Sequence, residues 1–288
     1  MFLERKICPI CIQKKFEKID FDINNNKIIK ILSNYYKKKL PKIVCKTFKY
    51  EVLKCVNCSL QFQKYICDDK LSNQLYESII DKNKSFEKKK RLNFKNFDNF
   101  IRELKIIKKI VKKPNHQINL LEFGCGWGFW SKLAQNLNFN INTVEISESR
   151  IKYLNENNIK NTKKIKKSVK YDLIYSDQVF EHLSHPGKEF SNLVKSLSSN
   201  GHIFIKVPSS FMMNFKKIFN IHPYMNILFP LEHINLYNKK VFLFLSKKYN
   251  LRICNYKILG IGGIHGIVLY LKNYFTNSFV IFKKNSFK

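Results

Sequence analysis

A short glycine-rich stretch in the middle of the chain limits its fold more than any other feature. The run LLEFGCGWGFW begins with apolar residues and then places Gly124, Gly126 and Gly128 in close succession. The apolar residues predict a strand over 118–123, and the amphipathic residues that follow predict a helix over 129–137. Doubly wound α/β sheets bind their ligands where the carboxyl end of a strand turns into a helix. The stretch therefore predicts a parallel sheet that carries a ligand at its carboxyl edge.

The same alternation of apolar runs and amphipathic segments continues along the C-terminal part of the chain. Strict alternation of strands and helices predicts a doubly wound α/β sheet. The last two expected strands have no helix between them, which predicts an antiparallel hairpin at the sheet edge. The further strands are expected at 141–146, 171–175, 202–207, 251–259 and 264–271, and the further helices at 148–157, 186–199 and 238–249.

The spacing of the glycines limits the chemistry of the ligand. The dinucleotide-binding pattern G-x-G-x-x-G is not met, because the third glycine comes one residue early and Phe129 stands in its place. Glu145 follows the next strand, 21 residues after Gly124, where a carboxylate can accept hydrogen bonds from both hydroxyls of a ribose. Glu122 adds a second negative charge beside the turn. A ribose-bearing ligand with a cationic group and no pyrophosphate suits this pair of carboxylates.

Four of the eight cysteines form two C-x2-C pairs, Cys8 with Cys11 and Cys55 with Cys58. No secretory signal precedes the first pair, so we expect a cytoplasmic protein whose thiols stay reduced. Two such pairs predict one tetrahedral zinc site, because each pair presents two thiolates from one tight turn. A redox pair is the alternative for either pair taken alone. A four-thiolate site has no open position for a substrate, so this zinc is expected to stabilise the fold.

The stretch between the two cysteine pairs and the four other cysteines can also be interpreted. The 43 residues between the pairs exceed the usual ribbon spacing, and the asparagine-rich part around Asn24 is interpreted as an inserted loop. Cys45 is an alternative zinc ligand, whereas Cys67 lies outside the pattern. Cys125 and Cys254 lie in apolar segments and are interpreted as small core residues.

The formal net charge of +32 comes almost entirely from lysine, because the chain has only five arginines. The lysines are spread over the whole chain, which favours a solvated surface; an anionic partner such as RNA is the alternative. Arginine is the usual residue for bidentate phosphate and base contacts, and its scarcity counts against nucleic acid. The longest apolar run, 258–271, is too short to cross a bilayer.

The polar residues before the sheet predict a separate region. Residues 71–80 and 94–111 carry apolar side chains at helical spacing, which predicts a linker helix and a second helix that packs on the main domain. We therefore expect a zinc-ribbon module over 1–68, which we call the N-terminal module, a helical linker over 69–113 and the sheet over 114–288.

An insertion at 209–231 interrupts the sheet region and is rich in aromatic residues and methionine. After a strand of such a sheet, it is interpreted as a lid or acceptor pocket. A dimer contact and a membrane-surface patch helped by the lysines are equal alternatives.

The glycine stretch resembles the first motif of class I S-adenosylmethionine-dependent methyltransferases, usually written (D/E)-x-G-x-G-x-G. The resemblance continues in order over about residues 117–271. Residues 171–183 are similar to the fourth strand and its loop, 197–208 to the turn and fifth strand, and 232–251 to the segment before the sixth strand. Residues 50–62 are similar to the N-terminal zinc module of many bacterial members of the methyltransferase-23 type, including zinc-containing sugar C-methyltransferases.

The sequence departs from that pattern at three places. Between the second and fourth strands the chain is short and basic over 161–170 and lacks the acidic residue that usually contacts the adenine, so that contact stays unassigned. Asn200 precedes Gly201 where the family usually has two glycines, and asparagine also accepts positive φ in a turn. The sugar C-methyltransferases place a tyrosine two residues before their Glu-His pair, where this chain has Pro230. Carbon is therefore not assigned as the methyl acceptor.

The resemblance implies a seven-stranded Rossmann-like methyltransferase sheet and S-adenosylmethionine as the cofactor. It implies methyl transfer to a small acceptor, and a sugar or nucleotide-sugar is the leading expectation. The residues implied to bind the cofactor are Glu122, Gly124, Cys125, Gly126, Gly128, Glu145, Asp177 and Gln178. The alternatives are an RNA methyltransferase, whose ribbon and lysines would hold RNA, and a non-catalytic module that binds zinc and S-adenosylmethionine.

Methyl transfer from a sulfonium is an in-line displacement, so the protein mainly aligns the acceptor and removes its proton. His233 and His182 are the candidate bases, because each follows a glutamate that can orient its imidazole. Glu232 is therefore the third candidate catalytic residue.

Overall fold

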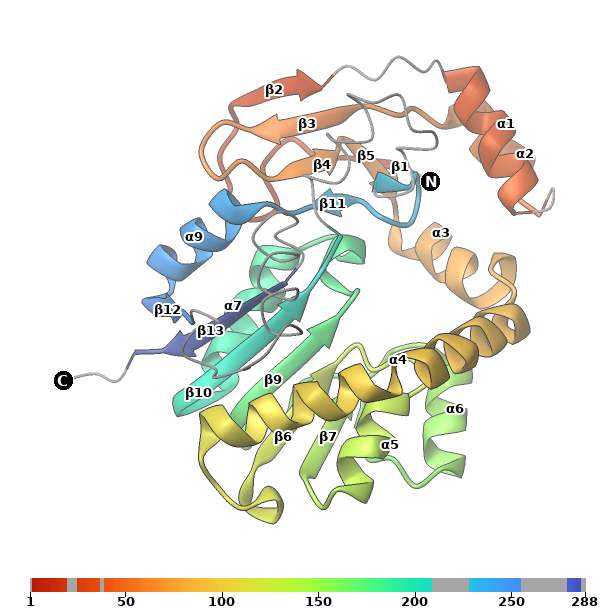
Figure 1. Cartoon of the computed structure of the whole chain (residues 1–288). Coiled ribbons are helices and arrows are strands. Elements are labelled where there is room, and N and C mark those ends of the chain that lie inside the picture. The colour runs from red at the N-terminus through yellow and green to blue at the C-terminus, as the bar shows by residue number, and fades with distance from the viewer. Residues whose placement is uncertain (1, 20–24, 37–38, 209–227, 255–278, 286–288) are drawn as a thin grey trace.

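The computed structural model describes residues 2–19, 25–36, 39–208, 228–254 and 279–285, apart from the side chains of Cys45 and of residues 92–96 (Figure 1). Its main sheet has seven strands in the order β12-β13-β10-β9-β6-β7-β8. These strands are β6 (Asn119–Phe123), β7 (Asn140–Val144), β8 (Asn161–Thr162), β9 (Tyr171–Asp177), β10 (Leu197–Lys206), β12 (Leu251–Ile253) and β13 (Phe279–Lys284).

The strands from β6 to β10 run parallel to one another, and β13 runs antiparallel to both β10 and β12. The prediction of a doubly wound seven-stranded α/β sheet with an antiparallel edge is confirmed. The expected strand at 264–271 lies outside the described residues. Strand β13 was not among the expected strands, because its apolar run FVIF is short and stops at two lysines.

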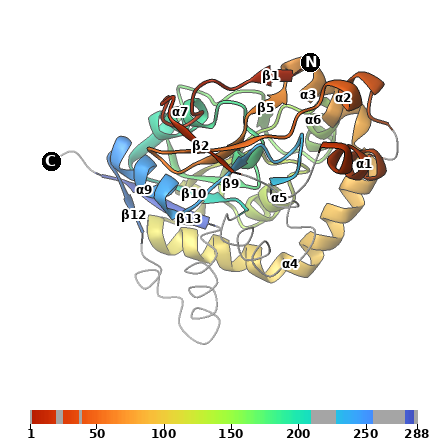
Figure 2. The same ribbon diagram turned by 90° about the horizontal axis from the view of Figure 1, so that it is seen from above.

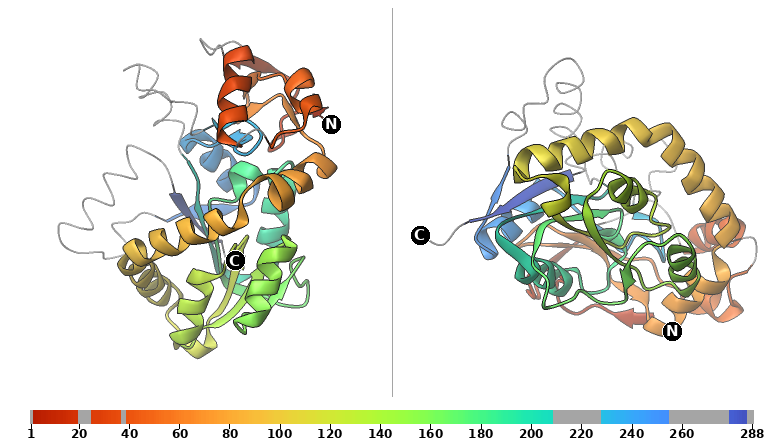
Figure 3. Two further views of the ribbon diagram at one scale, coloured as in Figure 1. Left: turned by 90° about the vertical axis from the view of Figure 1, so that its right-hand side faces the viewer. Right: turned by 90° about the horizontal axis from the view of Figure 1, so that it is seen from below.

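Helices cover both faces of the sheet, as Figures 1 and 3 show. On one face α4 (Lys82–Val111) and α5 (Phe129–Asn136) pack against the strands through residues such as Ile107 and Trp130. On the other face α7 (Pro186–Ser196) and α9 (Lys239–Lys248) contribute Phe190 and Val241. Helix α6 (Glu148–Glu156) follows β7. None of the helices that the structure describes is both long and apolar enough to cross a membrane.

The N-terminal module contains two small sheets, and seen from above it lies over the main sheet (Figure 2). One of its sheets includes a strand from the C-terminal half of the chain (Figure 1). Strand β1 (Phe2–Glu4) pairs with β5 (Tyr65–Cys67). The other sheet has the order β11-β4-β3-β2, in which β11 follows residue 234. Its strands are β2 (Phe16–Ile19), β3 (Val52–Cys55), β4 (Gln61–Gln63) and β11 (Asn235–Leu236).

Two helices occupy much of the spacing between the cysteine pairs, α1 (Asn25–Tyr35) and α2 (Lys42–Thr47). The expectation of an inserted loop is therefore wrong for the residues from 25 onward that these helices contain, whereas Asn24 itself lies outside the described residues. Ile28, Leu32 and Tyr36 are all buried, and their four-residue spacing forms one apolar face that the many asparagines and lysines obscure in the sequence. Helix α3 (Asp69–Gln74) and the single π-helical turn η1 (Leu75–Ile79) then lead to α4.

One hydrophobic core runs through the N-terminal module and one face of the main sheet. Cys8, Ile10 and Phe62 of the module belong to the same buried cluster as Phe180 and Tyr237. Gly187 at the start of α7 lies against the module, because a Cβ there would come within 2.8 Å of the carbonyl oxygen of residue 9. The module therefore packs directly on the part of the sheet that carries the candidate site.

Candidate functional site

The three glycines between β6 and α5 all have left-handed backbone conformations, with φ of 75° at Gly124, 59° at Gly126 and 68° at Gly128. Protein side chains fill the space beside the first and third glycines, because a Cβ there would come within 2.5 Å of Val179 and 2.4 Å of Leu154. A Cβ on Gly126 would meet nothing within 4 Å. The turn therefore leaves open space at Gly126, at the carboxyl edge of the sheet, where a ligand can approach the backbone.

Glu145 lies beside this turn, because β6 and β7 are neighbouring parallel strands. Its Oε2 accepts a hydrogen bond from Gly126 N at 2.9 Å, and its Oε1 accepts hydrogen bonds from Ile146 N and Ser147 N at 2.8 and 2.9 Å. Arg150 Nη1 lies 3.5 Å from Oε2. The carboxylate thus joins the glycine turn to the start of α6.

Glu122 is buried beneath the turn, and Ser131 Oγ at the start of α5 donates a hydrogen bond to its Oε2. Burial is the main reason that the pKa of Glu122 rises to about 8, so its carboxyl group carries a proton at neutral pH. A cation bound nearby would favour the ionised form. Cys125 is buried between the glycines and packs with Leu154 and Ile159.

Asp177 and Gln178 lie where β9 ends, and Asp177 belongs to a polar network that the sequence analysis did not foresee. Lys206 Nζ lies 2.8 Å from Asp177 Oδ2 and 3.0 Å from Glu103 Oε1. The hydroxyl of Tyr175 donates to Glu103 Oε2 at 2.8 Å. Gln178 has a left-handed conformation, with φ of 56°, and its backbone N–H donates to Lys206 O. The network fixes the edge of the sheet between the glycine turn and β10.

His182 and His233 lie side by side, with ring centroids 4.8 Å apart. His182 comes from the single turn η3 (Phe180–His182), and His233 precedes β11. His182 Nδ1 lies 3.0 Å from Tyr76 Oη and 2.9 Å from the carbonyl oxygen of Glu232. Tyr36 Oη donates to Glu232 Oε1 at 2.6 Å. The structure thus brings all three candidate catalytic residues together.

In this histidine cluster, burial favours the uncharged forms of Glu181 and His182. Neither carboxylate oxygen of Glu181 has a hydrogen-bond partner among the described residues, and burial raises the pKa of Glu181 to about 8. Burial also lowers the pKa of His182 to about 3. His182 Nε2 lies 3.8 Å from Glu181 Oε1, which is too far for a hydrogen bond. Ligand atoms of Glu181, His182 and His233 lie within 4.8 Å of one another, so this group could also hold a metal ion.

Two tyrosines of the histidine cluster were missed by the sequence analysis. Tyr36 lies one residue beyond α1, and Tyr76 lies in η1. Neither residue belongs to a motif, and Tyr36 continues the apolar spacing of Ile28 and Leu32, so it resembles a core residue in the sequence. Only the packing of the N-terminal module and the linker on the sheet places their hydroxyl groups at the histidines.

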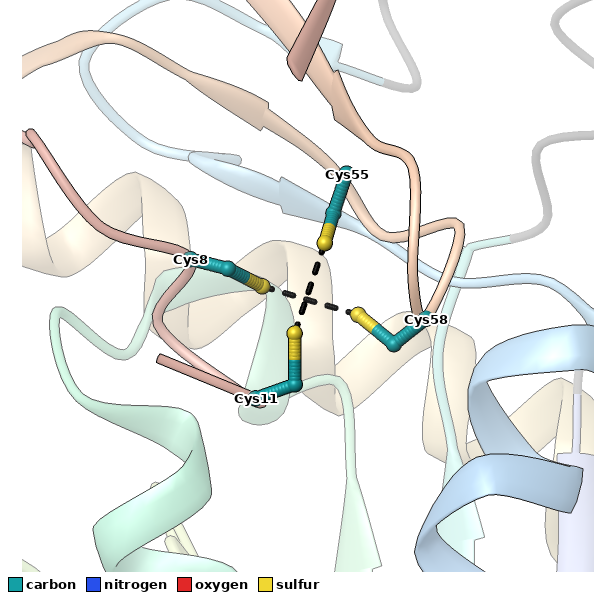
Figure 4. A group of neighbouring side chains, drawn as sticks. All are labelled: Cys8, Cys11, Cys55 and Cys58. Atoms are coloured by element: carbon teal, nitrogen blue, oxygen red, sulfur yellow. Dashed lines mark hydrogen bonds between the residues drawn. The ribbon is translucent and has the colours of Figure 1, made fainter. Parts of the chain in front are cut away.

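The four cysteines of the two C-x2-C pairs converge on one point, as Figure 4 shows. Their Sγ atoms lie within 4.8 Å of one another, with 3.5 Å between Cys8 and Cys58 and 3.3 Å between Cys11 and Cys55. Zinc bound tetrahedrally at about 2.3 Å from each sulfur would separate the sulfurs by about 3.8 Å. The donor set and its geometry therefore fit a structural zinc ion. Cys67 is buried in a different cluster, and the side chain of Cys45 lies outside the described part of the chain.

The strand order and the glycine turn between β6 and α5 fit the class I S-adenosylmethionine-dependent methyltransferase fold expected from the sequence. The chain belongs to the methyltransferase domain family, whose model matches residues 95–255. The family match therefore supports an enzyme over the non-catalytic alternative.

Two curated relatives match parts of the chain. The small ribosomal subunit protein uS4c of Stigeoclonium helveticum is 23% identical over 265 residues, which are 86% of this chain and 9% of that protein. The ubiquinone biosynthesis O-methyltransferase of Rickettsia akari (strain Hartford) is 29% identical over 109 residues, which are 33% of this chain and 43% of that protein. This chain thus spans less than half the length of either relative.

Solved methyltransferase structures are also similar to this chain. The plantazolicin methyltransferase BpumL in complex with SAH has a TM-score of 0.46 and 17% identity, and the match covers 74% of this chain and 94% of that one. A putative sarcosine dimethylglycine methyltransferase from Galdieria sulphuraria has a TM-score of 0.44 and 14% identity, with 68% and 88% covered.

Proposed function

We propose that the enzyme methylates a hydroxyl group of a small acceptor, a sugar or nucleotide-sugar, and that His233 accepts the proton of that hydroxyl. The observation that carries the proposal is the pairing of the two histidines, whose ring centroids lie 4.8 Å apart, with the buried carboxyl group of Glu181 beside them. The Rickettsia relative is by its name an O-methyltransferase, which supports oxygen as the methyl acceptor.

The residues near the glycine turn fit S-adenosylmethionine. Gly126 leaves the space for close approach, Glu145 supplies the carboxylate for the ribose, and Glu122 supplies a group that a nearby cation would ionise. Bound there, the cofactor supplies a methyl group activated by its sulfonium. The four cysteines, by the same reasoning, hold one zinc ion that stabilises the N-terminal module.

The environment of the two histidines favours His233 as the base. Both polar contacts of His182 reach its Nδ1, and burial lowers its pKa to about 3, which makes it a weak proton acceptor. Neutral His182 then serves to orient the cluster. Glu232 lies next to His233, and the hydrogen bond from Tyr36 fixes its carboxylate.

In the proposed reaction, the chain would hold the acceptor hydroxyl so that its oxygen could take the methyl group that S-adenosylmethionine would supply, with S-adenosylhomocysteine as the other product. The hydroxyl proton passes to the imidazole of His233 as the oxygen–carbon bond forms. The chain therefore contributes alignment and one proton acceptor, and the imidazolium later returns its proton to water. The polar network of Asp177 and Lys206 keeps this edge of the sheet in place.

RNA remains the second candidate acceptor, because of the net charge of +32. Recognition of single-stranded RNA usually requires aromatic side chains on which bases stack. The exposed large apolar residues around the cysteine pairs are aliphatic, namely Ile7, Ile12 and Val56. The described part of the N-terminal module therefore offers no stacking surface at its cysteine knuckles.

The test uses S-adenosylmethionine with a labelled methyl group. The purified protein is incubated with separate nucleotide-sugar, RNA and lipid fractions, and the label is then located by mass spectrometry. We expect label on an oxygen of a compound in the nucleotide-sugar fraction. Label found in RNA alone would make RNA the acceptor in place of the sugar. Label on a carbon atom would contradict the proposal that a hydroxyl oxygen is methylated.

A further inference from the structure

The segment that carries Glu232 and His233 has little regular structure of its own, and Gln63 of the N-terminal module holds its backbone. Gln63 Nε2 donates to the carbonyl oxygens of Phe229 at 3.1 Å and His233 at 2.9 Å. Gln63 N also donates to the carbonyl oxygen of Ile234 at 3.0 Å. Only 1% of Gln63 is exposed, so these hydrogen bonds are shielded from water. One glutamine therefore fixes the backbone before, within and after the Glu-His pair.

Arg5 adds a second fixing point from the same module. Its Nη2 donates to the carbonyl oxygen of Ile234 at 2.6 Å, and its Nε donates to that of Gln63 at 2.9 Å. Its guanidinium carbon also lies 4.9 Å from the centroid of the Phe62 ring. The planar donors of arginine suit several acceptors at once, and lysine cannot reproduce that arrangement. The guanidinium group of Arg5 is thus buried, and its donors hold the backbone at Ile234 and Gln63.

Asn235 extends the same network to the loop of the other histidine. Arg5 Nη1 donates to Asn235 Oδ1 at 2.8 Å. Asn235 Nδ2 donates in turn to the carbonyl oxygens of Phe180 at 3.1 Å and Leu183 at 2.7 Å, on both sides of His182. Asn235 is completely buried. The backbones beside both histidines therefore depend on hydrogen bonds that begin at Arg5.

We propose that the N-terminal module positions the two histidines for catalysis, with Arg5 and Gln63 as the positioning residues. The inference rests on the proposed function, because the position of the histidines matters only if they act on the acceptor. Arg5 lies three residues before Cys8, and Gln63 lies five residues after Cys58, so the cysteine cluster fixes the two ends of the module from which both side chains come. Within the described part of the chain, no hydrogen bond of this kind joins the module to the glycine turn at 124–128, which is called the cofactor turn below. Methyl transfer therefore depends on the module, whereas cofactor binding does not.

The chain offers a matched pair of variants, Gln63→Met and Gln61→Met. Gln61 lies two residues earlier on β4, so its side chain points to the same face, and it is also buried. Its Oε1 has no hydrogen-bond partner among the described residues, in contrast to the two bonds of Gln63. Arg5→Met and Arg5→Lys form a second pair, because lysine keeps the charge but cannot reach all of the acceptors.

Amide hydrogen exchange measures the positioning without any acceptor. We expect exchange in peptides covering 228–236 to become about tenfold faster in Gln63→Met and Arg5→Met, less so in Arg5→Lys, and to stay unchanged in Gln61→Met. The NMR signals of the imidazoles of His182 and His233, in protein with labelled histidine, should shift in the same variants. Calorimetry with S-adenosylhomocysteine should show affinity within about twofold of the wild type, which also proves that the variants fold.

With the acceptor found by methyl labelling, turnover of Gln63→Met should fall about 10²-fold, the cost of a displacement near 1 Å, while KM for the cofactor stays constant. Unchanged exchange and unchanged imidazole signals in Gln63→Met and Arg5→Met, or equal effects in Gln61→Met, would overturn the inference. A wild-type protein that does not bind S-adenosylhomocysteine would instead refute the proposed function, and the exchange data would still decide whether the module holds the segment.

Discussion

The cofactor turn and the histidine cluster lie at the same edge of the sheet but are built in different ways. The turn is formed by one continuous stretch, and Glu145 from the neighbouring strand completes it. The cluster takes Tyr36, Tyr76, His182 and His233 from four segments, two of which precede the sheet. Local geometry therefore determines the turn, whereas the packing of the N-terminal module determines the cluster. A change in the module should thus affect the two regions unequally.

Loss of zinc should have the largest effect of the changes considered. The proposed zinc ion stabilises the N-terminal module, so its loss should disturb the histidine cluster more than the cofactor turn. We expect about one zinc per chain in the wild type and none in Cys55→Ser/Cys58→Ser, because apparent binding free energies for four-ligand zinc sites reach about 10–16 kcal/mol. Zinc is measured by elemental analysis of purified protein. Cys67→Ser is the matched control, since Cys67 is buried in a different cluster and its loss should leave zinc content unchanged.

Full zinc content in the double variant would disprove the ligand assignment. A second equivalent of metal that survives in the double variant and is lost in Glu181→Gln would place a cation in the histidine cluster. In that case His233 would be a metal ligand, and its assignment as the base would fall.

His233→Ala should reduce turnover by about 10²–10⁴-fold, the usual contribution of a positioned base. Affinity for S-adenosylhomocysteine should stay the same, because the proposed base contacts the acceptor and not the cofactor turn. Steady-state kinetics on the labelled acceptor and calorimetry measure the two quantities. His116→Ala is the control, since His116 is exposed in the short turn before β6.

Two further outcomes sharpen this assignment. Normal turnover of His233→Ala would exclude it as the base, and a large loss in His182→Ala would then move the role to His182. Equal losses of turnover and of cofactor affinity in His233→Ala would mean that the cluster and the turn are not independent.

The same contrast explains what the sequence could predict. The glycine turn, Glu145 and the alternation of strands and helices follow from local spacing, because a strand, a turn and a helix are contiguous in the chain. Tyr36 and Arg5 were not predictable, because each acts through a contact with residues about 200 positions away. In the sequence Arg5 is only one of five arginines. Its proposed positioning role became visible only because the structure shows its side chain buried. The strand β11 pairs only two residues with β4, which is too short a run to leave a pattern.

Glu145→Ala should weaken S-adenosylmethionine binding by about 1–3 kcal/mol, the cost of losing charge-assisted hydrogen bonds. The carboxylate also accepts the hydrogen bond from Gly126 N, so its loss should loosen the turn itself. Titration calorimetry measures the change. Glu148→Ala is the control, because Glu148 is exposed and forms its ion pair with Lys163.

Gly126→Val should abolish cofactor binding, because the valine side chain would fill the open space beside the turn. Unchanged affinity in both Glu145→Ala and Gly126→Val would place the cofactor elsewhere.

The smallest expected effect is a pH dependence of cofactor affinity. Burial raises the pKa of Glu122 to about 8, so below pH 8 the carboxyl group of the free protein is protonated. The cationic cofactor favours the carboxylate and lowers this pKa, so binding releases a proton. Affinity should therefore rise with pH by up to about tenfold per unit below pH 8 and become constant above it. Calorimetry from pH 6 to pH 9, in buffers with different ionisation enthalpies, measures both the slope and the released proton.

The histidine cluster supplies the control for this last prediction, because burial also raises the pKa of Glu181 to about 8. If the proton belongs to the cofactor turn, Glu122→Gln should flatten the pH profile and Glu181→Gln should leave it unchanged. S-adenosylhomocysteine lacks the sulfonium charge, so its profile should be shallower than that of S-adenosylmethionine. A slope that persists in Glu122→Gln and disappears in Glu181→Gln would show that the cofactor is linked electrostatically to the histidine cluster. Cofactor binding at the turn and protonation of Glu181 in the cluster would then be coupled, although the two regions are built from different parts of the chain.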